Sequence, residues 1–221
     1  MKKLDIEDIQ KKIMSIGLNT GCGHIASAMS CSKVLVETYN GDPEGIIILS
    51  KGHGALAQYV ILNTLGKISD KELGTYYQNG GLGGHTTLNI KKGIYASTGS
   101  LGHGLAIGIG YAIANPKKKV YVILSDGECQ EGSTLESFLI IKRLKIKNIV
   151  PVIDVNGWQG FEANDNRYLP RHQIDAFHYY SQKGEGFGGL QDTLESHYTR
   201  ITQEIYDNWT KFINSKNERN N

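Results

Sequence analysis

Oxygen-bearing side chains follow two apolar runs of the sequence, at the points where predicted strands end. Asp126 comes after the run 119–124, and Asn156 comes after the run 148–153. Ligands of open α/β sheets bind beyond the carboxyl ends of parallel strands, so we expect these two side chains to lie side by side. Carboxylate and amide oxygens are ligands that Mg²⁺ accepts together with phosphate oxygens. Gly127, beside Asp126, would let a diphosphate approach the backbone closely.

Each motif also has a simpler interpretation when it is taken alone. Asp126 could cap the helix that follows it, and Asn156-Gly157 could be an ordinary turn. The separation of the two motifs across one strand–helix–strand unit favours a shared ligand site.

Histidines gather in the glycine-rich parts of the chain. His53, His85 and His103 lie within or beside glycine-rich loops, and His24 lies at a predicted helix start. Each of them alone could be a structural or surface residue. Together with a cation and diphosphate motif, they indicate polar groups that converge on one polyoxygenated ligand, where imidazole can donate, accept or shuttle protons near neutral pH.

Alternating strands and helices must position these residues. Apolar periodicity predicts helices over 5–18, 24–39, 132–144 and 191–213, and strands over 45–50, 119–124, 148–153 and 176–182. Strands joined through a helix pair in parallel. Pro151 predicts an edge position or a bulge for its strand, and the long loop 78–104 is typical of functional loops. We predict one α/β domain over 1–214, with a doubly wound, mainly parallel sheet and helices on both faces, and a polar tail over 215–221.

Composition excludes several classes of protein. The chain has 221 residues with 24 Lys and Arg against 22 Asp and Glu, too balanced a charge for a broad nucleic-acid surface. Its apolar runs fall short of the about 20 residues that cross a bilayer, and no apolar leader follows Met1. Three cysteines without metal spacing favour a reducing compartment. We therefore expect a cytoplasmic protein with neither nucleic-acid nor membrane partners.

The strand-end motifs resemble the signature of the thiamine-diphosphate enzymes, which is Gly-Asp-Gly followed later by Asn. Here the residues are Ser125-Asp126-Gly127 and Asn156, with Ser125 in place of the first glycine. Four more segments resemble, in order, the amino-terminal, diphosphate-binding half of the transketolases. They are Gly-His at 23–24, Leu-Ser-Lys-Gly-His-Gly at 49–54, Gly-His at 84–85 and Thr-Gly-Ser-Leu-Gly-His-Gly at 98–104.

The resemblance implies roles for individual residues. His24 and His85 would hold substrate hydroxyl or carbonyl oxygens, His197 falls near the family's late substrate histidine, and His53 would contact the cofactor diphosphate. The other implied positions are Gly99 and Leu101 along the cofactor, Gly127 at the diphosphate, Asp126, Asn156 and the Trp158 carbonyl around Mg²⁺ or another divalent cation such as Ca²⁺, and Glu131 as a buried glutamate that links paired active sites.

Three positions keep a further interpretation. Glu131 could instead be a solvent-exposed residue in the first turn of its helix, where the dipole favours it. Lys51 stands where the family often has Asn, and is either a cation beside the diphosphate or a solvated lysine. His103 stands where the family commonly has Gln.

The activity implied by the resemblance is transfer of a two-carbon ketol unit between sugars or sugar phosphates, with thiamine diphosphate and a divalent cation. In this family the glutamate that activates the aminopyrimidine comes from a pyrimidine-binding domain, which a chain of 221 residues ending here cannot contain. The resemblance thus implies a split enzyme, with a separate pyrimidine-binding chain in an α₂β₂ assembly that includes homodimer contacts.

Two alternatives belong to other functional classes. The chain could serve another thiamine-diphosphate decarboxylase or carbon–carbon ligase that acts on a 2-oxoacid or a specialised sugar. It could also be an inactive, cofactor-binding scaffold subunit. A scaffold would need none of the side chains of Asp126, Asn156 and His24, which argues against that class.

Overall fold

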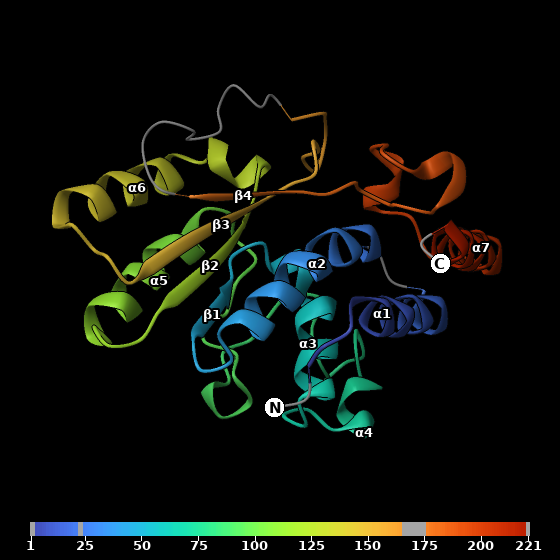
Figure 1. Ribbon diagram of the computed structural model, residues 1–221, viewed down its shortest axis with the longest axis horizontal. Coiled ribbons are helices and arrows are strands. Elements are labelled where there is room, and N and C mark those ends of the chain that lie inside the picture. Colours follow the sequence, from blue (N-terminus) through green and yellow to red (C-terminus); the bar gives the residue numbers. More distant parts are fainter. Residues whose placement is uncertain (1–2, 22–23, 165–175, 220–221) are drawn as a thin grey trace.

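Four parallel strands form the centre of the computed structural model, which describes residues 3–21, 24–164 and 176–219 (Figure 1). The strands β1 (Ile46–Leu49), β2 (Val120–Ser125), β3 (Ile149–Val155) and β4 (Phe177–Tyr180) lie in the order β1-β2-β3-β4. Strands β1 to β3 are almost entirely buried, as expected for parallel strands covered on both faces. The predicted fold class is confirmed.

Helices cover both faces of this sheet (Figure 1). The helices α1 (Ile6–Thr20), α2 (Ile25–Gly41), α3 (Ala55–Thr64) and α7 (Gln203–Arg219) share one apolar core with Ile47 and Leu49 of β1. The helices α5 (His103–Ala114) and α6 (Gly132–Leu144) share a second core with Ile46 and Ile48. This division follows from the alternation of successive strand side chains between the two faces. A short helix, α4 (Asp70–Leu73), follows α3.

Local sequence signals set the ends of α1. The Asp5 side chain accepts hydrogen bonds from the backbone N–H groups of Glu7 and Asp8 at 2.9 and 3.0 Å, which caps the helix start. Gly21 ends the helix in a left-handed conformation with φ of 59°. The helix predicted over 5–18 is confirmed, and every helix among the described residues is too short or too polar to cross a bilayer.

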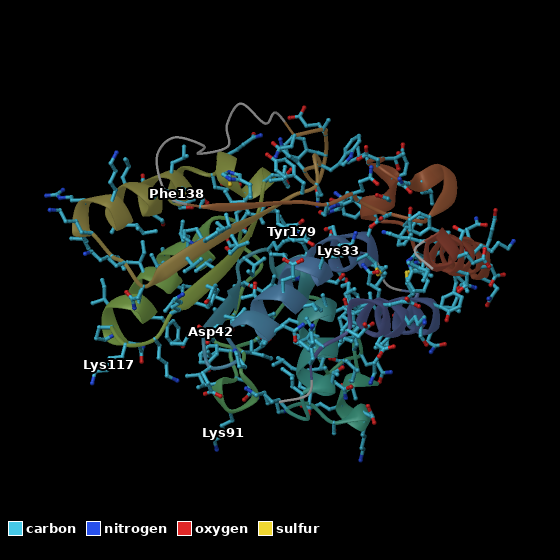
Figure 2. The ribbon with its side chains drawn as sticks, in the orientation of Figure 1. Lys33, Asp42, Lys91, Lys117, Phe138 and Tyr179 are labelled. Atoms are coloured by element: carbon cyan, nitrogen blue, oxygen red, sulfur yellow. The ribbon has the colours of Figure 1, made fainter. Side chains whose placement is uncertain are left out.

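Strand β3 lies inside the sheet and has no bulge at Pro151, so the prediction of an edge strand or a bulge is wrong for the strand as a whole, although Pro151 itself is paired on one side only. The register with β2 is continuous, and Pro151 lies opposite Val122. On the other side β4 begins to pair only at Val152, so just one neighbouring strand lies beside the proline. Figure 2 shows Tyr179 on β4, whose hydroxyl donates to Glu37 of α2 at 3.1 Å, and Phe138 on α6, within the second core.

The closing helix differs from the helix predicted over 191–213. Helix α7 runs from Gln203 to Arg219, so it starts later and includes most of the predicted tail. Asp192 adopts a left-handed backbone with φ of 57°, which interrupts any helix there. The Thr202 hydroxyl then accepts from the N–H of Ile205 at 3.3 Å, as a helix-capping side chain does.

Helix α5 packs unusually close to the sheet because of its glycines. A Cβ at Gly108 would lie 2.4 Å from Cγ2 of Val122, and a Cβ at Gly104 would lie 2.4 Å from Cβ of Ser50. This close approach places the loop that precedes α5 at the carboxyl ends of β1 and β2.

Candidate functional site

A cavity of about 440 Å³ lies at the carboxyl ends of the strands. Each strand contributes a residue from the segment that follows it: His53 after β1, Gly127 after β2, Asn156 after β3 and Lys183 after β4. The expectation that ligands bind beyond the carboxyl ends of the strands therefore leads to this cavity. The remaining lining residues come from the end of β2 and from loops and short 3₁₀ turns, and are His24, His85, Gly99, Leu101, Ser125, Gln130, Glu131, Trp158, Gln159, Gly160, Phe161, His197 and Tyr198.

The two predicted cation-ligand motifs meet beside this cavity: Gly127 and Asn156 line it, whereas Asp126 itself does not. Asp126 is only 1% exposed, and its carboxylate accepts from the N–H groups of Gly127 at 3.0 Å and Gly157 at 2.7 Å. Burial raises the pKa of Asp126, and the hydrogen bonds to its carboxylate oppose that rise. Asn156, next to Gly157, lines the cavity itself.

The simpler interpretations of these motifs also hold in the structure. Asp126 caps the short 3₁₀ turn Gly127–Gln130 through the Gly127 N–H. The Asn156 side-chain oxygen accepts from the Trp158 N–H at 3.1 Å, and Gly157 has a positive φ of 80°, as in a turn. Asp126 therefore acts as a cap and Asn156-Gly157 forms a turn, while both motifs also lie at the same cavity.

Four histidine rings converge on the cavity from separate segments of the chain. The His24 ring centroid lies 5.1 Å from that of His197, 5.9 Å from that of His53 and 6.1 Å from that of His85. Burial lowers the pKa of His24 and His53, and lowers that of His197 to about 3, helped by the charge of Lys183. These three imidazoles are therefore neutral at pH 7, able to donate from one nitrogen and accept at the other.

His24 is held in an uncommon backbone conformation. It precedes α2 with φ of 66°, in the left-handed region that non-glycine residues rarely occupy. Its N–H donates to the His197 carbonyl at 3.2 Å, which joins two of the cavity's histidines through the backbone. Gly23 of the same predicted motif lies outside the described residues.

Lys183 is the main cavity residue to which the sequence assigned no role. Its side chain is 1% exposed, and burial together with the charge of Lys51 lowers its pKa to about 8. Its Nζ lies 3.4 Å from the carbonyl oxygen of Gln159. The strand-end rule that singled out Asp126 could have found it, because Lys183 follows β4 closely. Tyr198, also missed, packs its ring 4.5 Å from that of His197.

The other predicted site residues lie around the cavity rim. Gly99 and Leu101 line it, with Leu101 37% exposed. Glu131 lines it too, and its side chain is exposed in the single chain, directly before α6. Trp158 lines it while its ring N–H donates to Asp192 at 2.7 Å. His103, which the sequence grouped with the converging histidines, does not line the cavity: it is exposed at the first residue of α5.

Lys51 is neither solvated nor unpaired, so the interpretation as a solvated lysine is wrong. Its Nζ lies 2.6 Å from a carboxylate oxygen of Asp154, and both side chains are 0% exposed. Burial opposes the charged form, but the attraction of Asp154 prevails and raises the pKa of Lys51. Lys51 lies two residues after β1, and Asp154 lies one residue before the end of β3.

Glu128 is a buried carboxylate that ties the ends of β1 and β2 to the loop before α5. It accepts from the Ser50 hydroxyl after β1, from the Gly102 N–H at 2.7 Å before α5, and from the Ser125 N–H at 3.3 Å. Burial raises its pKa against these bonds. Glu128 therefore positions the cavity walls.

The cavity suits an anionic ligand rich in oxygen. It offers the buried cation of Lys183 and neutral imidazoles, and the buried Nδ1 of His197 finds no hydrogen-bond partner within the described part of the chain. That part also holds no cluster of three or more His, Cys, Asp or Glu residues arranged for a metal. The predicted ligand set, however, has one such residue, Asp126, beside amide and carbonyl oxygens. The residues present thus fit a diphosphate with a bridging cation.

Comparison with known proteins identifies the family. The family model described as "Transketolase, thiamine diphosphate binding domain" matches residues 38–162. One of the subunits of the apulose-4-phosphate transketolase of Actinobacillus succinogenes is 35% identical over 85% of this chain and 76% of its own length. A 6-deoxy-6-sulfo-D-fructose transketolase subunit from a Clostridium species is 28% identical over 90% of this chain and 73% of its own.

Solved structures agree on the fold. The transketolase of Leishmania mexicana matches 99% of this chain with a TM-score of 0.72 at 18% identity, and a Pichia stipitis transketolase variant matches 95% with 0.76 at 19% identity. The chain spans 46% and 41% of those two proteins. The resemblance stated from the sequence motifs is confirmed: this chain belongs to the transketolase family and carries its thiamine diphosphate binding domain.

Proposed function

We propose that this chain is the diphosphate-binding subunit of a split transketolase-like enzyme, which transfers a two-carbon ketol unit between sugars or sugar phosphates. The observation that carries the proposal is the meeting of the Asp126 and Asn156 motifs with four histidines at one cavity. Two relatives that are themselves named as single subunits of apulose-4-phosphate transketolases support a division of the enzyme between chains.

The cavity residues suggest a division of labour. Asp126, Asn156 and the Trp158 carbonyl would hold Mg²⁺ or another divalent cation, and His53, Gly127 and Lys183 would hold the diphosphate. Gly99 and Leu101 would lie along the rest of the cofactor. Thiamine diphosphate, when bound, supplies the electron sink for the two-carbon fragment. The chain's own residues would bind and orient the cofactor and exclude water from it.

The neutral histidines suit proton handling on the sugar. His24 and His85 would hold hydroxyl or carbonyl oxygens of the substrate, and the unpartnered Nδ1 of His197 would accept a hydroxyl proton or donate to an oxygen, depending on its tautomer. The low pKa values of His24 and His197 keep lone pairs on these two imidazoles available at pH 7. Phe161 and Tyr198, exposed at the rim, would meet the far end of the substrate.

A second chain would complete the active site. We propose a partner that carries the pyrimidine-binding domain, in an α₂β₂ assembly where Glu131, at the exposed rim, links paired sites. The cytoplasmic location expected from the composition stays a prediction.

Reconstitution tests this proposal. The purified chain with thiamine diphosphate, Mg²⁺, a ketose phosphate and an aldose phosphate should give no turnover, and addition of the pyrimidine-binding chain should start transfer. Turnover by this chain alone would refute the split. Donor choice separates the alternative decarboxylase function: hydroxypyruvate should serve as donor, whereas carbon dioxide release from pyruvate with acetyl transfer would indicate the 2-oxoacid enzyme. An assembled complex without any turnover would favour the scaffold.

A further inference from the structure

A row of buried polar groups runs beneath the cavity from Lys51 to Asn156. Lys51 Nζ donates to Oδ2 of Asp154 at 2.6 Å. The Ser30 Oγ of α2 lies 3.0 Å from the same carboxylate oxygen, and Nδ2 of Asn156 lies 3.3 Å from Ser30 Oγ. All four side chains are buried, so these groups depend on one another for hydrogen bonds.

Chemistry fixes the direction of each bond in this row. The ionised carboxylate of Asp154 can only accept. The other oxygen close to the Ser30 hydroxyl is the Ser27 carbonyl at 3.1 Å, which also only accepts. The single hydroxyl proton of Ser30 is thus directed at an acceptor, and its lone pairs are left for Asn156. The atom of Asn156 that meets Ser30 must therefore be its NH₂ group.

The amide oxygen of Asn156 is then turned the other way. It faces the loop after β3, where it accepts from the Trp158 N–H at 3.1 Å. We infer that Ser30, held by the Lys51–Asp154 pair, is a positioning residue that presents the oxygen of Asn156, rather than its NH₂ group, to the cation site. This inference rests on the proposed function, in which that oxygen binds the divalent cation.

Without Ser30 the amide would keep only its hydrogen bond from the Trp158 N–H. A turned amide would present its NH₂ group, which cannot bind a cation. The row adds no net negative charge beneath the cavity, because the ammonium of Lys51 neutralises the carboxylate of Asp154. Hydrogen-bond partners of this kind orient metal ligands in many proteins. Their loss lowers the metal affinity even though they do not contact the metal.

Ser181 provides a matched control for Ser30. Its hydroxyl donates to Oδ1 of Asp154 at 2.5 Å, the other oxygen of the same carboxylate. Ser30→Ala and Ser181→Ala each remove one hydroxyl donor from Asp154, but only Ser30→Ala removes the acceptor of the Asn156 NH₂ group. A purely structural role of the row predicts similar effects of the two substitutions.

The test measures Mn²⁺ binding to the full chain in the presence of pyrophosphate, by water-proton relaxation, with thermal melting as a check of folding. Ser30→Ala should weaken Mn²⁺ binding about tenfold, as loss of a ligand-orienting partner does. Ser181→Ala should leave Mn²⁺ binding unchanged. In an Asn156→Ala background, Ser30→Ala should have no further effect, because it acts through that residue.

The outcomes separate this inference from the proposed function. Three results would overturn the positioning role. Mn²⁺ binding could weaken equally in Ser30→Ala and Ser181→Ala, it could weaken in neither, or the effects of Ser30→Ala and Asn156→Ala could add. The cation site would then still stand if Asn156→Ala weakens Mn²⁺ binding. Unchanged binding in Asn156→Ala, or no binding by the unsubstituted chain, would overturn the proposed cation site itself.

Discussion

The carboxylate of Asp126 accepts a hydrogen bond from the backbone N–H of Gly157 at 2.7 Å, which ties the segment after β2 to the segment after β3. Because Gly157 directly follows Asn156, this bond sets the spacing between the two proposed cation ligands. The same carboxylate accepts from Gly127, where the diphosphate would approach the backbone. Asp126 therefore shapes the site, in addition to its proposed role as a cation ligand.

Asp126→Ala should abolish the Mg²⁺ dependence of thiamine diphosphate binding by the assembled complex. It should also lower the free energy of unfolding by about 1–3 kcal/mol, because two backbone N–H groups lose their acceptor. Calorimetric titration with and without Mg²⁺ measures the first effect. Asp42→Ala is the control, since Asp42 bonds to Tyr121 near the start of β2, at the opposite end of the sheet. Unchanged Mg²⁺ dependence in Asp126→Ala would remove Asp126 from the site.

Pyrophosphate affinity should fall as the pH rises through about 8, the pKa to which burial lowers Lys183. Below that pH the ammonium is charged and attracts the anion, and above it the attraction is lost. An arginine keeps its charge throughout this range. The pyrophosphate affinity of Lys183→Arg should therefore lack the part of the fall that comes from deprotonation of Lys183. Calorimetry at several pH values, with Mg²⁺ present, compares the two proteins. Identical pH profiles would place Lys183 outside the diphosphate site.

Acid should destabilise the protein partly through its cavity histidines. The folded-state pKa values of His24, His53 and His197 lie below the ordinary 6.5, so the unfolded chain binds more protons than the folded chain below about that pH. The free energy of unfolding therefore falls as the pH drops from 7 toward 5.

Urea denaturation at both pH values measures this fall. His197→Asn should show a smaller fall than the unsubstituted chain, while exposed His103→Asn should show the same fall. An equal fall in His197→Asn and the unsubstituted chain would mean that the cavity does not depress the His197 pKa.

Glu128→Ala should lower the free energy of unfolding by about 3 kcal/mol, because three donors around a buried carboxylate lose their acceptor. Glu131→Ala, three residues along and exposed, should stay within about 0.5 kcal/mol of the unsubstituted chain. Urea denaturation of the two variants measures the difference. Equal stability of both would contradict the role given to Glu128.

The sequence led to the candidate site because this cavity lies at strand ends, and apolar runs reveal strand ends well. The strands over 119–124 and 148–153 lie within a residue or two of β2 and β3, and Asp126 and Asn156 follow from them. His24, His53 and His85 converge as the glycine-rich segments indicated, and His197 joins them, whereas His103 does not line the cavity. The individual roles of these residues stay predictions.

Features that depend on distant partners could not be predicted from local patterns. Lys51 is buried because Asp154, 103 residues away, neutralises it. The position of Pro151 inside the sheet depends on where β4 begins to pair. The start of α7 was missed because its apolar period continues upstream, where the left-handed backbone of Asp192 and the cap at Thr202 override it.

The position of a bound cation tests the central claim most directly. Crystals of the chain with its partner, thiamine diphosphate and Mn²⁺ would locate the ion by anomalous scattering. We predict one Mn²⁺ within about 2.3 Å of side-chain oxygens of both Asp126 and Asn156, and in contact with the diphosphate. An ion bound elsewhere, or a diphosphate held away from Gly127, would contradict the account.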